Sequence, residues 1–506
     1  MELLSWLWSQ LLSSCSNVTT LGISLTVFAL VFDFMKRRKR WNYPPGPGTL
    51  PFIGNLLQVD VTNPSKTSQK LAKKFGKAFS VQVGWIDIVV LSGYEIIKEA
   101  LCQKPEDFSD RPILPLTREL GYAKNCEGIL FAKYSLSWKE QRRFCLSTLR
   151  NFGLGKKSLE QRVTEEAGFL CSEFSAKQGH PFNPHILIKN AVSNVICTMT
   201  FGDRYEYKDE TFLELMHLLE DLMKSLSSFL TQVVALVPVL SHIPGPHRKA
   251  WQLHHEFLDF IRKTVKEHKE SRDPAFARDL IDSFLEEMEK NKGNPETSFN
   301  ETNLLHIALD MFAAGTETSS TTLRWGLIYM VLYPDIQKKA QKEIDNVIGR
   351  DRPPTMEDQV NLPYTNAVIH EIQRYGDILP GALPHMAYQD TEIQGYFIPK
   401  GTIVIINLSS LLKDEAVWKK QHQFYPENFL DSDGQFVRQE AFLPFSTGRR
   451  VCLGEQLAKM ELFIFFTSFL QHFTFCIPPN QPRPRENGYF SIIMSPHPYQ
   501  ICAIPR

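Results

Sequence analysis

The sequence lacks an excess of charge of either sign. Its 506 residues include 56 Lys plus Arg and 56 Asp plus Glu, so the formal net charge is zero. A neutral chain has no long-range field to hold a polyanion, and no basic stripe recurs beyond the single cluster Lys36–Arg40. We therefore expect no binding of nucleic acid.

The sequence also lacks paired cysteines, a dinucleotide fingerprint and internal linkers. Its nine cysteines form no CxxC pair, a usage typical of reduced thiols in the cytosol. Because no GxGxxG pattern occurs, any electrons from NADPH must arrive through a separate protein. No repeat or low-complexity segment interrupts residues 49–506, which favours one large domain there.

An apolar run near the start of the chain ends in a basic cluster. Val18–Met35 is long enough as a helix to cross most of a bilayer, and Asp33 is its one flaw. The basic cluster follows the run and no Lys or Arg precedes it, an order that keeps the basic end cytosolic. We predict a signal anchor over residues 1–35. The alternative is a cleaved signal peptide or a buried helix, although no small-residue cleavage site precedes the cluster.

Beyond the anchor, helical periodicity dominates the sequence. Residues 36–48 combine the basic cluster with prolines that predict a stiff extended spacer. We predict a mainly α fold with a small β-sheet. The predicted helices include 137–150, 211–223, 251–269, 277–290, 301–333, 335–348, 365–375 and 454–473, and the predicted strands are 78–83, 86–91 and 402–408. The apolar run Phe229–Leu240 is too short to span a membrane, and it is either a core segment or a membrane-surface contact.

The strongest chemical signal is the segment Phe445-Ser-Thr-Gly-Arg-Arg-Val-Cys-Leu-Gly454, directly before a predicted helix. Gly448 permits a tight turn, and Gly454 lets the backbone approach a flat ligand. Loop amides can point at the sulfur of Cys452, which makes this cysteine suited to be a thiolate ligand of iron. The other eight cysteines lack such surroundings and are expected to pack as small apolar residues.

This loop resembles the haem-binding loop of the cytochrome P450 family, and other motifs of the family follow in the family's order across nearly the whole chain. The motifs Trp138–Phe144, Asn151–Lys157, Phe312–Thr318 and Leu457–Phe466 most resemble the J subfamily of the microsomal family 2. The resemblance implies one cytochrome P450-type domain over residues 49–506 that binds haem b. It also implies a monooxygenase that inserts one atom of O2 into apolar substrates, in this subfamily polyunsaturated fatty acids such as arachidonate.

The same resemblance implies partners and a location. We expect electrons from NADPH–cytochrome P450 reductase, cytochrome b5 as a further partner, and a single-pass anchor in the endoplasmic reticulum membrane with a cytosolic catalytic domain. Three alternatives stay open: a broad xenobiotic or steroid monooxygenase, a haem-thiolate isomerase that needs no reductase, and a non-catalytic haem sensor. Lys139 and Arg143 are expected to face the reductase.

The resemblance also assigns roles to single residues. Glu317 and Thr318 would control proton delivery, and Thr318 can bond either a carbonyl one turn back or a water. Glu371 and Arg374 would form a buried structural pair, with Asn428 where many relatives carry Arg or His. The expected haem contacts are Cys452 as the iron ligand, Phe445, Gly448, Arg450, Gly454, Trp138, Arg142, Arg111, His385 and Ala314. The expected pocket residues are Ile113, Leu116, Asp310, Met311, Ile378, Leu379, Leu383, Ile492 and Ile493.

Overall fold

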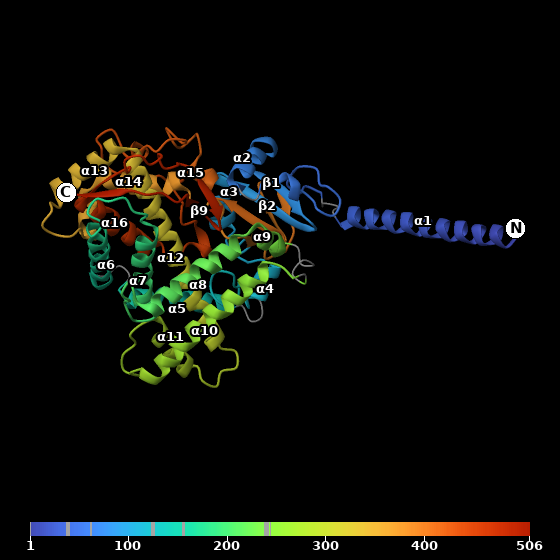
Figure 1. Cartoon of the computed structure of the whole chain (residues 1–506), viewed down its shortest axis with the longest axis horizontal. Coiled ribbons are helices and arrows are strands. Elements are labelled where there is room, and N and C mark those ends of the chain that lie inside the picture. The colour runs from blue at the N-terminus through green and yellow to red at the C-terminus, as the bar shows by residue number, and fades with distance from the viewer. Residues whose placement is uncertain are drawn as a thin grey trace.

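Helix α1 (Glu2–Lys36) projects from a mainly helical body in the computed structural model (Figure 1). The structure describes residues 2–36, 41–60, 63–122, 127–153, 157–236, 242 and 244–506. Within α1, Val18–Lys36 is long and apolar enough to cross a membrane, and 6% of this window is buried in the structure. An exposed apolar helix of this length is compatible with a membrane anchor. Some residues named in the sequence analysis lie outside the described part of the chain. They are residues 37–40 of the basic cluster, residues 237–240 of the apolar run and Cys126.

Helices make up most of the body, which confirms the predicted fold class. The α-helices are α2 (Pro64–Phe75), α3 (Tyr94–Lys98), α4 (Pro115–Glu119), α5 (Leu136–Asn151), α6 (Lys157–Ser175), α7 (His185–Thr200), α8 (Glu210–Ser227), α9 (Phe229–Leu236), α10 (His247–Ser271), α11 (Leu280–Lys290), α12 (Glu301–Leu332), α13 (Pro334–Val347), α14 (Pro363–Gly376), α15 (Ser409–Leu412) and α16 (Glu455–His472). Short 3-10 helices used below are η1 (Leu56–Gln58), η5 (Pro426–Phe429) and η6 (Gly448–Arg450), and η2 (Glu99–Gln103) is a short π-helix.

The strands form small sheets, and β1 and β2 lie on the side of the body from which α1 projects (Figure 1). The strands are β1 (Ala78–Val83), β2 (Ile86–Ser92), β3 (His385–Met386), β4 (Thr391–Ile393), β5 (Tyr396–Ile398), β6 (Ile403–Asn407), β7 (Phe473–Cys476), β8 (Gly488–Ser491), β9 (Ile493–Pro496) and β10 (Cys502–Pro505). The largest sheet has the order β1-β2-β6-β3, in which β2 pairs with β6 in parallel. The other strands pair as β7 with β10, β4 with β5 and β8 with β9.

The long helix α12 runs through the core and packs closely against α7. Gly315 makes this approach possible, because a Cβ atom built there would lie 2.5 Å from Cδ1 of Ile196. At its N-terminus Asn300 caps the helix by accepting a hydrogen bond from the amide of Asn303. The backbone of α12 therefore lies directly against the side chain of Ile196, three residues before Thr318.

The segment predicted to be a spacer lies along β1. The amide of Ser80 donates to the carbonyl of Pro45 at 2.7 Å, and its hydroxyl donates to the carbonyl of Pro44 at 2.8 Å. A Cβ atom at Gly46 would lie 1.9 Å from the carbonyl oxygen of Ser80. An extended proline-rich backbone has free carbonyls, so it can dock on a strand. The prolines therefore attach the chain to the sheet rather than hold it away.

Candidate functional site

Cys452 lies on the loop between η6 and α16. Its amide donates to the carbonyl of Phe445 at 3.0 Å, which folds the loop back on itself around the thiol. Although Cys452 is an exposed residue, the protein packed around its thiol raises the thiol's pKa, whereas the amide of Gly454 and the nearby cation of Arg142 lower it. A thiol held in this way is deprotonated when it binds a metal cation.

The two glycines of the loop have different surroundings. Gly448 has a φ of 79°, and a Cβ atom there would lie 2.2 Å from the carbonyl oxygen of Leu101 in η2. A Cβ atom at Gly454 would meet no protein atom within 4 Å. The backbone at position 448 therefore packs on protein, whereas at Gly454 it faces open space that suits the approach of a flat ligand.

Three predicted cations gather near this loop, and their described hydrogen bonds all go to backbone carbonyls. Arg450 donates to the carbonyls of Ser109, Ile129 and Ala132 at 2.9, 3.2 and 2.6 Å. Arg111 donates to the carbonyls of Leu130, Leu383 and Pro384 at 2.7 to 3.0 Å, and Arg142 donates to that of Val451 at 2.5 Å.

These cations are removed from water without an ion pair to a carboxylate, which makes their charged form unfavourable. Burial and the neighbouring cations lower the pKa of Arg450 to about 8, although the carboxylate of Asp110 opposes this shift. Burial also lowers the pKa of Arg111 to about 10, and that of His385 well below its usual range. A ligand with two carboxylates would neutralise such a cluster. The propionates of haem have this chemistry, so the residues present fit haem.

The two other predicted contacts of the haem edge are occupied by protein groups. Trp138 places its ring 3.8 Å from the guanidinium carbon of Arg450, and its indole N–H donates to the carbonyl of Ile129 at 3.2 Å. His385 shares a hydrogen bond of 2.6 Å between Nδ1 and the carbonyl of Phe108. Nδ1 must therefore carry a proton, which leaves Nε2 as the nitrogen able to meet a ligand.

On α12, Thr318 and Glu317 point toward different partners. The hydroxyl of Thr318 donates to the carbonyl of Ala314 at 3.0 Å. Of the two partners predicted for it, a carbonyl one turn back or a water, the structure shows the carbonyl. Glu317 forms an ion pair of 2.6 Å with Lys189 of α7, and both side chains are mostly buried. Sequence reasoning missed Lys189, although a single lysine within the apolar run of α7 was a signal for a buried partner.

The predicted structural network comes together around Arg374. Its guanidinium forms two hydrogen bonds of 2.7 Å with the carboxylate of Glu371, and neither side chain is exposed. It also donates to the carbonyls of Leu412, Gln421 and Gln423. The amide of Asn428 in η5 lies 3.4 Å from both oxygens of Glu371, so its contact is long and weak.

Asp310, a predicted pocket residue, is held by the loop before α5. Its carboxylate accepts hydrogen bonds from the hydroxyl of Tyr122 at 2.8 Å and from the amides of Ile129 and Leu130 at 2.7 and 3.0 Å. Burial raises its pKa, and these three donors oppose the shift. The loop of residues 127–130 is thus tied to α12 next to the cation cluster.

A recess lies between α12, α14, α16 and the loop before Cys452. Among its lining residues are Thr318, Phe445, Ile378 and Leu379, all of them predicted. Its other lining residues are Ser319, Thr322, Gln373, Leu412, Pro444, Ala458 and Leu462. The remaining predicted pocket residues are Leu116, Met311, Leu383 and Ile492, which are half-buried, Ile493, which is buried, and Ile113, which is exposed.

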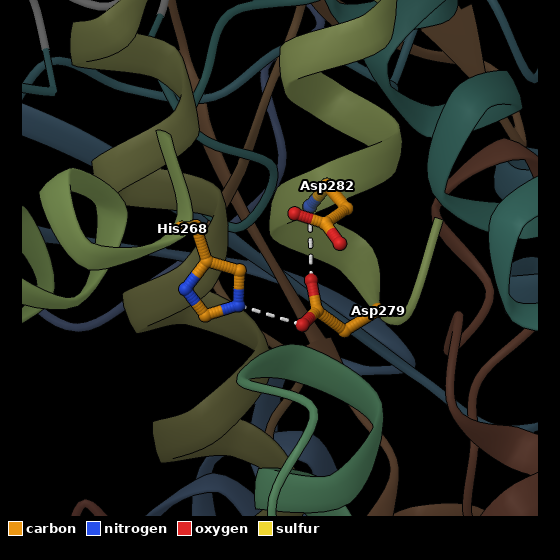
Figure 2. Close-up of side chains that lie close together, drawn as sticks. All are labelled: His268, Asp279 and Asp282. Atoms are coloured by element: carbon orange, nitrogen blue, oxygen red, sulfur yellow. Dashed lines mark hydrogen bonds and ion pairs between the residues drawn. The ribbon is translucent and has the colours of Figure 1, made fainter. Parts of the chain in front are cut away.

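A second cluster of possible metal ligands joins α10 to α11 (Figure 2). His268 lies 2.7 Å from Asp279 through Nε2 and 2.9 Å from the carbonyl of Thr264 through Nδ1, so both nitrogens face acceptors. Burial opposes protonation, but the carboxylate of Asp279 raises the pKa of His268. Asp279 also caps α11, and Asp282 pairs with Arg278. These ligand atoms are engaged with one another, so we interpret the cluster as structural.

The thiol on a glycine-bounded loop, the open space at Gly454 and the buried cations define the arrangement of a haem-thiolate protein. The sequence profile of the cytochrome P450 family matches residues 44–503. The chain belongs to the cytochrome P450 family of monooxygenases, whose members bind haem b.

Similar proteins refine the assignment within the family. The chain is 53% identical to cytochrome P450 2D6 of Homo sapiens over 489 residues, which is 96% of this chain and 98% of the relative. It is 51% identical to cytochrome P450 2D14 of Bos taurus over 98% of this chain and 100% of the relative. Cytochrome P450 2D15 of Canis lupus familiaris is 50% identical over 96% of this chain and 98% of the relative. The predicted resemblance to the J subfamily is therefore wrong, since these relatives belong to 2D.

Proposed function

We propose that this chain is a membrane-anchored monooxygenase that oxidises small apolar foreign compounds with electrons from NADPH–cytochrome P450 reductase. The observation that carries the proposal is the cluster of buried Arg111 and Arg450 and half-buried Arg142 near Cys452, whose hydrogen bonds within the described part of the chain go to backbone carbonyls. Haem bound there would supply the activation of dioxygen. The roles below are those of the protein's own groups.

The residues divide into those that hold haem and those that handle protons. Cys452 would supply the thiolate ligand, and the three arginines would hold the propionates, with His385 as a further donor. Thr318 would hold a proton donor near the substrate, because its hydroxyl can exchange the carbonyl of Ala314 for a water. Lys189 holds the carboxylate of Glu317 on the α7 side, so a proton would reach Thr318 from Glu317 only after this ion pair opens.

The substrate class follows from the charges of the proposed pocket. Asp310 is the only charged residue among the nine pocket residues, and it is an anion rather than a cation. A fatty-acid carboxylate would find no cationic partner among these residues, because the one charged group, Asp310, is itself an acid bonded to Tyr122, Ile129 and Leu130. Together with the similarity to the 2D subfamily, this favours broad oxidation of neutral or cationic foreign compounds over fatty-acid epoxidation.

Reconstitution with NADPH and the reductase tests the proposal. We expect oxidised products from a panel of neutral and basic drugs, and little turnover of arachidonate or linoleate. Product formed without reductase would indicate the isomerase, and haem binding without any product would indicate the sensor. Turnover confined to the fatty acids would contradict the substrate class.

The ligand assignment has its own test. Cys452→Ser should abolish the absorption band near about 450 nm of the reduced protein with carbon monoxide, since that band depends on thiolate donation. Cys145→Ser is the matched control, because Cys145 is a buried cysteine of α5. A band that persists in Cys452→Ser would overturn the assignment.

A further inference from the structure

The polar residue within the apolar part of α1 is bonded to the catalytic domain. The side-chain oxygen Oδ1 of Asp33 accepts a hydrogen bond of 2.9 Å from the indole N–H of Trp85 and one of 3.2 Å from the amide of Phe52. Asp33 is only 4% exposed, whereas its neighbours in the helix are open to the surroundings. Asp33 is therefore a point of attachment rather than a flaw in the apolar run.

An aromatic contact supports the same attachment. The ring of Phe32 meets the ring of Trp85 edge to face, with centroids 6.0 Å apart and an interplanar angle of 82°. Trp85 lies in the turn between β1 and β2, and the amide of the adjacent Gly84 donates to the carbonyl of Ile53 at 3.2 Å. The end of α1 thus contacts one continuous corner of the body, built from this turn and from residues 52 and 53.

The chain after the basic cluster is attached as well. The carbonyl of Asn42 accepts a hydrogen bond of 2.8 Å from the amide of Phe397 in β5, and its side-chain amide donates to the carbonyl of Gly395. Pro44 and Pro45 are bonded to β1, as described above. Attachments on both sides of residues 37–40 restrict how far α1 can swing relative to the body.

The length of the helix fixes the depth of this corner in a membrane. Val18–Lys36 has 19 residues, and at about 1.5 Å per residue it spans about 28 Å, close to the hydrocarbon thickness of about 30 Å. Asp33 is three residues from the cytosolic end of this window, so it lies about 5 Å from that end. Trp85 and Phe52, which contact Asp33, must then lie at the boundary between acyl chains and headgroups.

The side chains at this corner suit that boundary. Tryptophan is favoured there because its ring is apolar and its N–H is polar. Leu57 of η1 is 76% exposed, Trp85 54% and Phe52 45%, and Ile53 is also exposed. We name these four residues, Phe52, Ile53, Leu57 and Trp85, the apolar corner. Exposed apolar side chains beside the end of a spanning helix are buried when they enter the lipid.

We propose that Asp33 and Trp85 lock the membrane anchor onto the catalytic domain and hold the apolar corner in the boundary layer of a phospholipid bilayer. This inference rests on the proposed membrane anchor. It explains why a carboxyl group is retained in the span, since two N–H donors offset the cost of placing it there. A locked anchor gives the domain one tilt on the membrane, whereas a free tether would allow many.

The test measures the tilt of haem in full-length holoprotein reconstituted in phosphatidylcholine bilayers. Linear dichroism of haem absorption in oriented bilayers reports the tilt, and flotation with the vesicles reports insertion. Asp33→Leu removes the acceptor but makes the span more apolar, and Trp85→Phe keeps an aromatic ring but removes the N–H. Both variants should float as the wild type does and lose haem dichroism.

A double variant and a control isolate the bond. Because Asp33→Leu already removes the hydrogen bond that Trp85→Phe breaks, the double variant should lose no more dichroism than Asp33→Leu alone. Phe34→Leu alters an exposed aromatic residue at the same depth and should keep the dichroism of the wild type. Wild-type dichroism in floating Asp33→Leu or Trp85→Phe would overturn the lock. A wild-type chain that fails to float would instead overturn the anchor itself.

Discussion

Two buried arginine sites in this molecule are built in opposite ways. Arg374 lies against the carboxylate of Glu371 with two hydrogen bonds of 2.7 Å. Arg450 lies among three carbonyls, and its burial, followed by the nearby cations of Arg111 and Arg142, lowers its pKa. The first site is complete within the protein, whereas the second still needs negative charge. In these two sites, the cation paired with a carboxylate serves the structure, whereas the cluster of cations without such a pair suits a ligand with negative charge.

The largest expected effect is a loss of stability on breaking the pair of Arg374 and Glu371, the site that is complete within the protein. Glu371→Ala would leave the buried cation of Arg374 unpaired, so the free energy of unfolding should fall by about 3–5 kcal/mol, with or without haem. Chemical denaturation followed by circular dichroism measures this loss. Glu371→Gln keeps one acceptor and should lose less. A loss below about 1 kcal/mol in Glu371→Ala would show that Arg374 is not held by this pair.

Substitutions in the cluster of Arg450, Arg111 and Arg142 should change mainly the affinity for haem. Arg450→Met removes a cation that we propose as a partner of a haem propionate, so haem affinity should fall by roughly 10- to 100-fold. Transfer of haem to excess apomyoglobin measures this change. Arg449→Met is the matched control, because Arg449 is exposed and pairs with Glu106 at 2.9 Å. Equal haem loss in the two variants would contradict a special role of Arg450.

A buried acid extends the comparison to negative charge. Both carboxyl oxygens of Glu461 in α16 lack a well-formed hydrogen bond among the described residues, and burial raises its pKa to about 8 from a usual value of 4.5, against a contact with Ser319. Between these two pH values the folded chain binds one proton more than the unfolded chain. The free energy of unfolding should therefore fall as pH rises from 4.5 to 8.

Glu461→Gln should flatten this part of the pH dependence. As pH rises, the free energy of unfolding of the variant should increase relative to that of the wild type, because the neutral amide of Gln does not ionise as the carboxyl group of Glu461 does. Denaturation at a series of pH values measures the difference, and Glu455→Gln, near the start of the same helix, is the control. An unchanged slope would show that Glu461 is solvated.

Exposed charges should give the smallest effect, since solvent screens them. Lys139 and Arg143 lie exposed on α5, the helix of Trp138 and Arg142. Lys139→Glu or Arg143→Glu should raise the reductase concentration needed for half-maximal turnover by roughly two- to five-fold. Spectral shifts on substrate binding should not change. An unchanged reductase titration would remove these residues from the docking face.

Local patterns predicted the helices well because apolar stripes and caps are local. The predicted helix 301–333 is α12 (Glu301–Leu332), with Asn300 as its cap. The prediction of a helix from residue 277 was three residues early, because Asp279 caps α11 and only the residues after it are helical. The anchor window differs by a single residue from the predicted run.

Contacts between distant residues could not be predicted from such patterns. The bond of Asp33 to Trp85 and the ion pair of Lys189 with Glu317 join elements far apart in the chain. Glu461 is buried in the apolar helix α16, although a charged side chain in a sequence pattern predicts an exposed position. The subfamily was mistaken for a related reason. The motifs that carried the resemblance are short segments, most of them on α5, α12 and α16, whereas the similarity that assigns the subfamily extends over 489 residues.

The close approach of Gly448 to the carbonyl of Leu101 has a consequence for how this protein can evolve. The height of the cysteine loop is set by main chain resting on main chain, so exchanges of neighbouring side chains leave it unchanged. Segments such as 113–120 and 378–383 can then accumulate substitutions and acquire new substrates while the sulfur of Cys452 keeps its place. A single added methyl group at position 448 would end that tolerance, because no rotamer change can relieve a clash with a backbone oxygen.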